Sequence, residues 1–298
     1  FIGVISCILI AILAVIVMAV APTVSLNAPA GSAYIATSTI TFTYTQTNSS
    51  NFSTCSFMNN LSGTFKVNIS NATHVSGIAT SYVIDSPSDG NYIWNVNCSD
   101  PVGNSVLADS TNRTFTVDRT NPDPIRFLST NNSFVSDTTP EIRWNETNDA
   151  NFDEYEVQLS SSLSMASPTQ TVTVSTRTSN STTLSNIAPD GQYYVLVKAT
   201  DLAGNNVNTT PLYLYVDTAA PSVTLNSPSS NNTFRSDSTP DFNVTVVDGT
   251  PDDCQLFLSA QGGSALTLNA TERTVTNGTQ LNLTASSMPD GVYQFAIE

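Results

Sequence analysis

Charged side chains are scarce in this chain, and histidine is nearly absent. Only 11% of its 298 residues are charged, and the nine Lys and Arg stand singly among 24 Asp and Glu. A chain with a formal net charge of -15 and no basic stripe is not expected to bind nucleic acid. The single histidine, His74, excludes a multi-histidine metal site and is expected to be solvated.

The motifs of enzyme catalysis are missing as well. The sequence has no thiolate–histidine pair, no nucleophile elbow and no glycine-rich phosphate loop. Asp248, Asp252 and Asp253 carry the oxygen ligands that calcium uses, but turn formation is the ordinary role of such residues. We therefore predict no enzyme activity, no cofactor, and no catalytic or metal-binding residues.

Residues 1–21 form an unbroken apolar run, and the first charge in the chain is Lys66. At a rise of about 1.5 Å per residue, a helix of this length matches the hydrocarbon thickness of a bilayer. We therefore predict an apolar α-helix over residues 1–21. A signal peptide needs basic residues before the run, and a membrane anchor normally has them beside it. A third interpretation is that a peptidase cut just before Phe1.

An uncharged apolar amino-terminal segment before a β-rich, glycosylatable region resembles an archaeal type IV pilin or archaellin. The resemblance covers residues 1–21 by pattern only: Ile5 stands where bacterial pilins commonly carry Glu, and Pro22 ends the segment early. It implies helices that lie in the membrane before assembly and then pack in a filament core. The residues expected in that core are Ile5, Ile8, Ile12, Val15 and Ile16.

Beyond Ala21 the sequence repeats with a period close to 100 residues. The openings APTVSLNAPA, NPDPIRFLST and APSVTLNSPS align, as do the later blocks SDGNYIWNV, PDGQYYVLV and PDGVYQFAI. We therefore predict three domains, over residues 22–118, 119–217 and 218–298. Pro122 and Pro221 stiffen short linkers, so the tandem is expected to be a semi-rigid rod.

Each copy has short alternating strands, such as Tyr193, Val195 and Val197, separated by Pro, Gly, Asn and Asp. This pattern is typical of an immunoglobulin-like antiparallel β-sandwich. TDLAGN followed by YLYVDTAAPSV also resembles the tandem Ig-like repeats of prokaryotic surface proteins. We expect hairpin turns at residues 100–104 and 201–205. The predicted fold class is mainly β: one apolar helix followed by three tandem Ig-like sandwiches, the third incomplete.

The third copy stops at Glu298, by analogy with the second before its last strand. The preferred interpretation is that the natural protein continues. The alternative is that a neighbouring subunit donates a strand.

The cysteines follow the repeat. Cys55 and Cys98 stand where an Ig-like sandwich places a bridge between its sheets, and the second copy has Tyr155 and Ala199 in these two columns. We predict a Cys55–Cys98 disulfide between the sheets, and a cysteine just beyond Glu298 to pair with Cys254. The alternative is free buried thiols. Cys7 is expected to be a packing residue, and a disulfide implies an oxidising exterior.

Sixteen Asn-x-Ser/Thr sequons point to the same compartment. Asn97, beside Cys98, is expected to face the interior and to stay unmodified. The candidates for N-glycosylation are Asn48, Asn51, Asn60, Asn68, Asn71, Asn97, Asn112, Asn131, Asn145, Asn180, Asn208, Asn231, Asn243, Asn269, Asn277 and Asn282.

The function predicted from these features is that of a structural subunit of an extracellular, cell-surface, pilus-like filament. It would form a helical homo-oligomer through residues 1–21, with glycosylated Ig-like domains projecting outward to adhere to cells or other surfaces. The alternative is a single-span surface adhesin or cell-envelope protein that does not polymerise.

Overall fold

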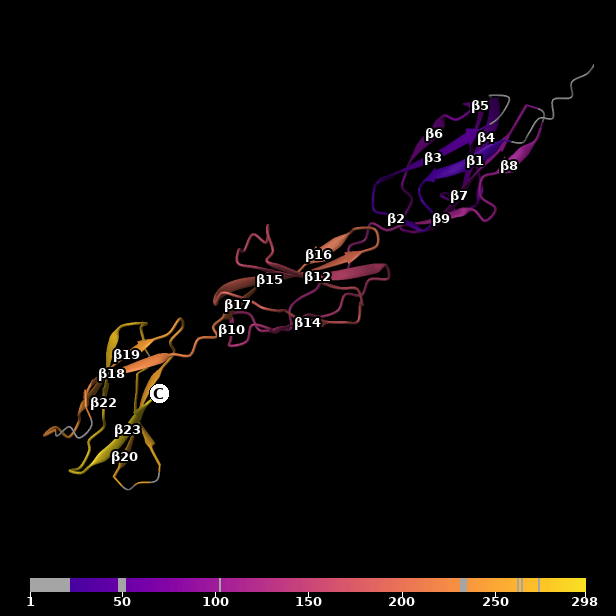
Figure 1. Cartoon of the computed structure of the whole chain (residues 1–298). Coiled ribbons are helices and arrows are strands. Elements are labelled where there is room, and N and C mark those ends of the chain that lie inside the picture. Colours follow the sequence, from indigo (N-terminus) through magenta and orange to yellow (C-terminus); the bar gives the residue numbers. More distant parts are fainter. Residues whose placement is uncertain are drawn as a thin grey trace, which may run out of the picture. The chain divides into compact units, whose positions relative to one another are not determined.

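The computed structural model describes residues 22–47, 52–101, 103–230, 235–261, 263, 265–272 and 274–298 (Figure 1). The chain divides into two compact units. The first comprises Phe1–Asp123, Asn148–Asp153 and Ala199–Val207. The second comprises Pro124–Thr147, Glu154–Lys198 and Asn208–Glu298.

The predicted fold class is wrong, because the described residues form an all-β structure without an α-helix. The helix prediction falls on residues 1–21, outside the described residues, and so do its packing positions Ile5, Ile8, Ile12, Val15 and Ile16. A continuous apolar run shows that a segment is hydrophobic, but it has no periodicity that would specify a helix. Within the described ranges, the structure has no helix with the length and hydrophobicity needed to cross a membrane.

Two sheets make the first sandwich. One has the strand order β1-β3-β6, and the other has the order β2-β9-β7-β4-β5 with β8 beside β7. Strand β2 pairs with β9 in parallel, and the other pairs are antiparallel. The strands are β1 (Thr23–Ala28), β2 (Ala33–Ile35), β3 (Thr39–Thr47), β4 (Phe52–Asn59), β5 (Lys66–Val75), β6 (Ala79–Asp85), β7 (Gly90–Ser99), β8 (Ser105–Leu107) and β9 (Arg113–Val117).

Alternation along these strands builds the first core. Side chains of successive residues point to opposite faces, so Phe42 of β3 and Trp94 of β7 meet between the sheets with ring centroids 5.3 Å apart. Both rings are fully buried, and Phe42 also contacts Phe57 and Phe115. The remaining buried members are Leu26, Ile40, Tyr44, Cys55, Val96, Cys98 and Val117.

The second sandwich repeats this plan. Its larger sheet has the order β10-β17-β15-β12-β13 with β16 beside β15, and β10 again pairs in parallel with β17. A two-stranded sheet, β11-β14, accompanies it. The strands are β10 (Ser133–Val135), β11 (Glu141–Arg143), β12 (Phe152–Ser160), β13 (Gln170–Val174), β14 (Ser181–Thr183), β15 (Gly191–Asp201), β16 (Asn206–Asn208) and β17 (Leu212–Val216).

The third copy has two three-stranded sheets, β18-β19-β22 and β21-β20-β23. Its core again comes from alternate residues, with Phe242 and Phe295 in ring contact at 4.8 Å. The strands are β18 (Ser222–Ser227), β19 (Asp241–Val247), β20 (Cys254–Ala260), β21 (Thr267–Glu272), β22 (Gln280–Thr284) and β23 (Tyr293–Ile297).

Candidate functional site

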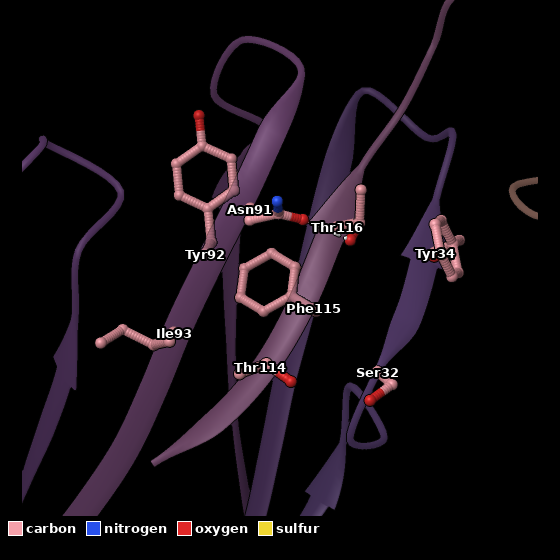
Figure 2. A pocket seen from close by; sticks show the side chains of 8 residues that line it. All are labelled: Ser32, Tyr34, Asn91, Tyr92, Ile93, Thr114, Phe115 and Thr116. Carbon is pink, nitrogen blue, oxygen red and sulfur yellow. Dashed lines mark hydrogen bonds between the residues drawn. The ribbon is translucent and has the colours of Figure 1, made fainter. Parts of the chain in front are cut away.

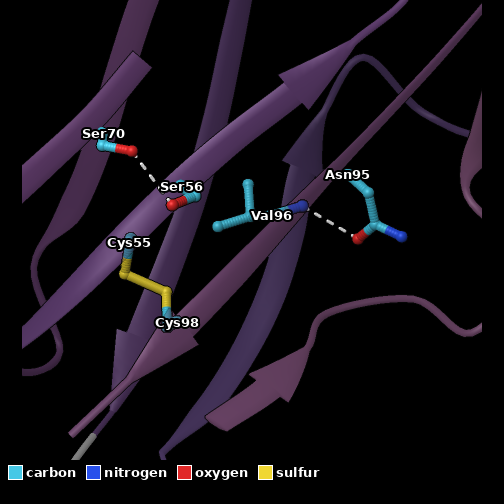
Figure 3. The surroundings of a disulfide bond; sticks show 6 residues. All are labelled: Cys55, Ser56, Ser70, Asn95, Val96 and Cys98. Atoms are coloured by element: carbon cyan, nitrogen blue, oxygen red, sulfur yellow. Dashed lines mark hydrogen bonds between the residues drawn. A yellow bond between two sulfur atoms is a disulfide. The ribbon is translucent and has the colours of Figure 1, made fainter. Parts of the chain in front are cut away.

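Cys55 and Cys98 form a disulfide (Figure 3). They are register partners on the neighbouring strands β4 and β7, with their Cα atoms 4.0 Å apart, and both are fully buried. The expectation of a bridge between two sheets is therefore wrong, because β4 and β7 lie side by side in one sheet. Antiparallel pairing alone brings the two side chains together on the core face.

The other two copies have no disulfide at the positions equivalent to Cys55 and Cys98 in the described part of the chain. In the second copy, Tyr155 is fully buried, and its hydroxyl accepts a hydrogen bond from the Thr147 N–H at 2.8 Å and donates one to the Arg177 carbonyl at 3.0 Å. In the third, Cys254 is a buried free thiol. Burial, and then the charge of Asp253, raise the pKa of this thiol, so it stays protonated and weakly reactive at neutral pH.

The linker after β9 carries a carboxylate that sequence reasoning missed. Asp118 is 6% exposed, and its Oδ2 accepts a hydrogen bond from Asn151 Nδ2 at 2.6 Å. Its Oδ1 accepts the Thr120 N–H at 3.1 Å, and its carbonyl accepts one from Asn205 Nδ2 at 2.9 Å. All four residues belong to the first compact unit, so Asp118 joins the end of β9 to two segments of the second repeat copy, one through its carboxylate and one through its carbonyl.

The same contact recurs one copy later, within the second unit. Asp217 follows β17, and its Oδ2 accepts a hydrogen bond from Thr250 Oγ1 at 2.6 Å. In each case the donor lies 33 residues after the carboxylate. The signal in the sequence was the Val-Asp pair that begins both VDRT and VDTA.

The two predicted hairpin turns are present. Asp100 and Asp201 each accept the backbone N–H and the side-chain amide of an asparagine four residues later, at 2.7–2.9 Å. Gly103 and Gly204 adopt φ values of 95° and 88°, which favour glycine. The turns lead into the short strands β8 and β16, which pair with β7 and β15.

Several carboxylates approach one another in the first unit. Partial burial raises the pKa of Asp149, and the charges of Asp201, Asp118 and Asp123 raise it further, against the lowering effect of the Asn151 N–H. In the described part of the chain, no three His, Cys, Asp or Glu side chains lie where they could hold a metal ion. Of the calcium candidates, Asp248 caps a turn by accepting the Thr250 N–H at 2.7 Å, and Asp253 accepts a hydrogen bond from Gln255 at 3.1 Å.

The described sequon asparagines are all exposed or half-buried. Asn97 is exposed, so the expectation that it faces the interior is wrong: it alternates with the buried Cys98 along β7 and must point to the opposite face. The side chains that lie outside the described part of the structure include those of His74 and of the sequon residues Asn48, Asn51, Asn71 and Asn231.

Residues 128–218 match the family model of the bacterial Ig-like domain. The match covers the second copy, whose plan recurs in the first, and the chain therefore carries tandem Ig-like domains. Such domains are typically structural modules and not catalysts. Nothing in the comparisons indicates a pilin or an archaellin, and curated proteins give no match.

Several solved structures are distantly similar to this chain. The fibronectin(III)-like modules of Clostridium thermocellum CbhA match at 12% identity and a TM-score of 0.45, over 65% of this chain and 94% of that one. The FN1-FN3 domains of chicken CNTN1 match at 17% identity and a TM-score of 0.41, over 65% of this chain and 68% of that one. Domains A168-A170 of titin match at 14% identity and a TM-score of 0.36, over 93% of this chain and 92% of that one. TM-scores below 0.5 do not establish a shared fold over these lengths.

Replacing both Cys55 and Cys98 with Ala should destabilise the first sandwich by about 4 kcal/mol, because the bond closes a loop between residues 43 positions apart and restricts the unfolded chain. The measurement is urea unfolding followed by Trp94 fluorescence in a Trp144→Phe background, which leaves a single tryptophan. Dithiothreitol should shift the parent chain to the same midpoint. A variant as stable as the oxidised parent would contradict the prediction.

Asp149→Asn should stabilise the first unit at pH 7 and have no such effect near pH 3. Folding raises the pKa of the Asp149 carboxyl, so its ionised form destabilises the folded state once the pH is above that pKa. Asparagine has no charge and removes this cost. Its amide oxygen can still accept the Asn151 N–H, as Asp149 does at 2.6 Å. Melting temperatures at the two pH values measure this. Asp149→Ala, which also loses the hydrogen bond, is the control and should gain less.

Proposed function

We propose that this chain is the spacer region of an extracellular surface or adhesion-type protein, in which Ig-like domains hold a functional part away from the cell. The observation that carries the proposal is the repeated linker carboxylate, Asp118 and then Asp217, with its partner 33 residues later. A spacer needs junctions that resist bending. A partly buried, charge-assisted hydrogen bond at each junction supplies such resistance.

The disulfide supports the location. Structural disulfides persist in oxidising compartments, which agrees with a position outside the cytoplasm. The accessible sequon asparagines also fit a surface that is exposed to glycosylation.

Two narrower versions concern residues 1–21. In the first, this apolar segment associates with its equivalents in neighbouring copies, and the protein is a filament subunit. In the second, it holds single copies at the membrane. Electron microscopy of purified surface material separates them, because only the first yields fibres of constant diameter labelled by antibodies to this chain.

Antibodies raised against the full chain should label intact cells of the source organism, and protease added to those cells should remove the label. A cytoplasmic protein should remain intact under the same treatment. If labelling requires permeabilised cells, the surface proposal is wrong.

Asp118→Ala should speed tryptic cleavage after Arg119 by roughly tenfold, since removal of a charged hydrogen-bond partner costs about 1–3 kcal/mol and opens the linker more often. The measurement is the rate of limited proteolysis of the folded chain. Asp217→Ala, at the other junction, is the matched control and should leave cleavage after Arg119 unchanged. Equal rates for the parent chain and Asp118→Ala would contradict a structural role for this contact.

A further inference from the structure

The outer face of the larger sheet in the second sandwich carries a cluster of aromatic side chains. Strands β10, β17 and β15 are neighbours there (Figure 1), and their register places Phe134 beside Tyr215, and Tyr215 beside Gln192. A second row lies one step along the strands, where Tyr213 is opposite Tyr194. We call Phe134, Tyr194, Tyr213 and Tyr215 the aromatic platform.

The platform is not part of the core. The residues that alternate with it, Tyr193 and Leu214, are the buried ones, so its rings point to solvent. Phe134 is 67% exposed, which is unusual for a phenylalanine, because leaving such a ring in water forgoes the free energy of burying it.

The rings support one another. The centroids of Phe134 and Tyr215 are 5.3 Å apart with the planes tilted by 39°, and those of Tyr194 and Tyr213 are 5.1 Å apart in an edge-on arrangement. Contacts of this kind fix ring orientation before any ligand arrives, which lowers the entropy cost of binding.

A shallow groove of about 280 Å³ runs over this face. No charged residue lines it, although the chain carries a net charge of -15. The amides of Asn132 and Gln192 stand at its sides, and each offers both hydrogen-bond donors and an acceptor. Its lining is Asn132, Phe134, Gln192, Tyr213, Leu214 and Tyr215.

The first sandwich has the same groove in the same place, with a volume of about 250 Å³ (Figure 2). Its cross-strand row matches the first row of the platform position by position. Tyr34 stands at the position of Phe134, Thr116 at that of Tyr215, and Asn91 at that of Gln192. The Thr116 hydroxyl donates a hydrogen bond to Asn91 Oδ1 at 2.8 Å. The groove is therefore a product of the fold, whereas the set of aromatic rings belongs to the second copy.

We propose that the aromatic platform binds neutral carbohydrate, with sugar rings laid against its aromatic faces. The face of an aromatic ring is electron-rich and attracts the slightly positive C–H groups on the flat side of a pyranose. Sugar hydroxyls, which donate and accept, match the amides of Asn132 and Gln192. An uncharged groove in an acidic chain favours a neutral ligand over phosphate- or carboxylate-bearing ones.

This inference is independent of the spacer role, and either could fail without the other. Asn131 is a sequon residue beside the groove, and its Oδ1 accepts a hydrogen bond from the Tyr213 N–H at 2.7 Å. A glycan attached to Asn131 could itself cover the platform. The test therefore uses the full chain from a host without N-glycosylation.

The probes are neutral hexasaccharides of β-1,4-linked glucose, xylose and mannose and of α-1,4-linked glucose, with an oligogalacturonate as the acidic comparison. Calorimetry and saturation-transfer NMR should show at least one neutral sugar binding with a Kd of about 0.1–1 mM, and no binding of the acidic one. Phe134→Ala should weaken binding about tenfold or more. Because Phe134 is exposed, this variant should keep the parent melting temperature.

The first sandwich supplies matched variants. Tyr213→Thr with Tyr215→Thr copies the outer residues of the first groove and should abolish binding, whereas Tyr34→Ala should leave it unchanged. Thr114→Tyr with Thr116→Tyr should create a second, weaker site, because Ile93 and Ser32 still stand where the second groove has Tyr194 and Asn132. The proposal is overturned if no neutral sugar binds, if binding survives Phe134→Ala, or if the chain forms a dimer that Phe134→Ala dissociates.

Discussion

The register between the two long neighbouring strands is the constraint on which the rest of each sandwich depends. In the first copy, β4 and β7 pair so that Cys55 faces Cys98 and Phe57 faces Val96. In the third, β20 and β23 pair so that Leu256 faces Ile297. Because side chains alternate between the two faces of a sheet, a slip of one residue would turn the core side chains of the slipped strand to solvent.

The same alternation creates the outer surfaces. Tyr193 and Leu214 are buried in the core, so their neighbours along β15 and β17 face outward. These neighbours are Gln192, Tyr194, Tyr213 and Tyr215. Packing fixes the geometry of the face and leaves its chemistry free to vary. The two copies show this freedom, since equivalent positions carry one aromatic ring in the first and four in the second.

Much of the fold could be predicted from the sequence. The repeat of close to 100 residues, the strand alternation and the turns at Gly103 and Gly204 are local patterns, and the structure contains them. The helix assigned to residues 1–21 has no counterpart among the described residues. The outward direction of Asn97 could have been predicted, because neighbours on a strand point to opposite faces and Cys98 is its neighbour.

The sequence by itself determined that each copy is a β-sandwich and which cysteines stand in matching columns, because alternation and repeat spacing are properties of the chain alone. Only the tertiary structure decided that Cys55 and Cys98 meet within one sheet, and that Asp118 and Asp217 each bind a side chain 33 residues further on. Such contacts depend on how strands pair and segments pack over long separations, and no local pattern specifies that choice.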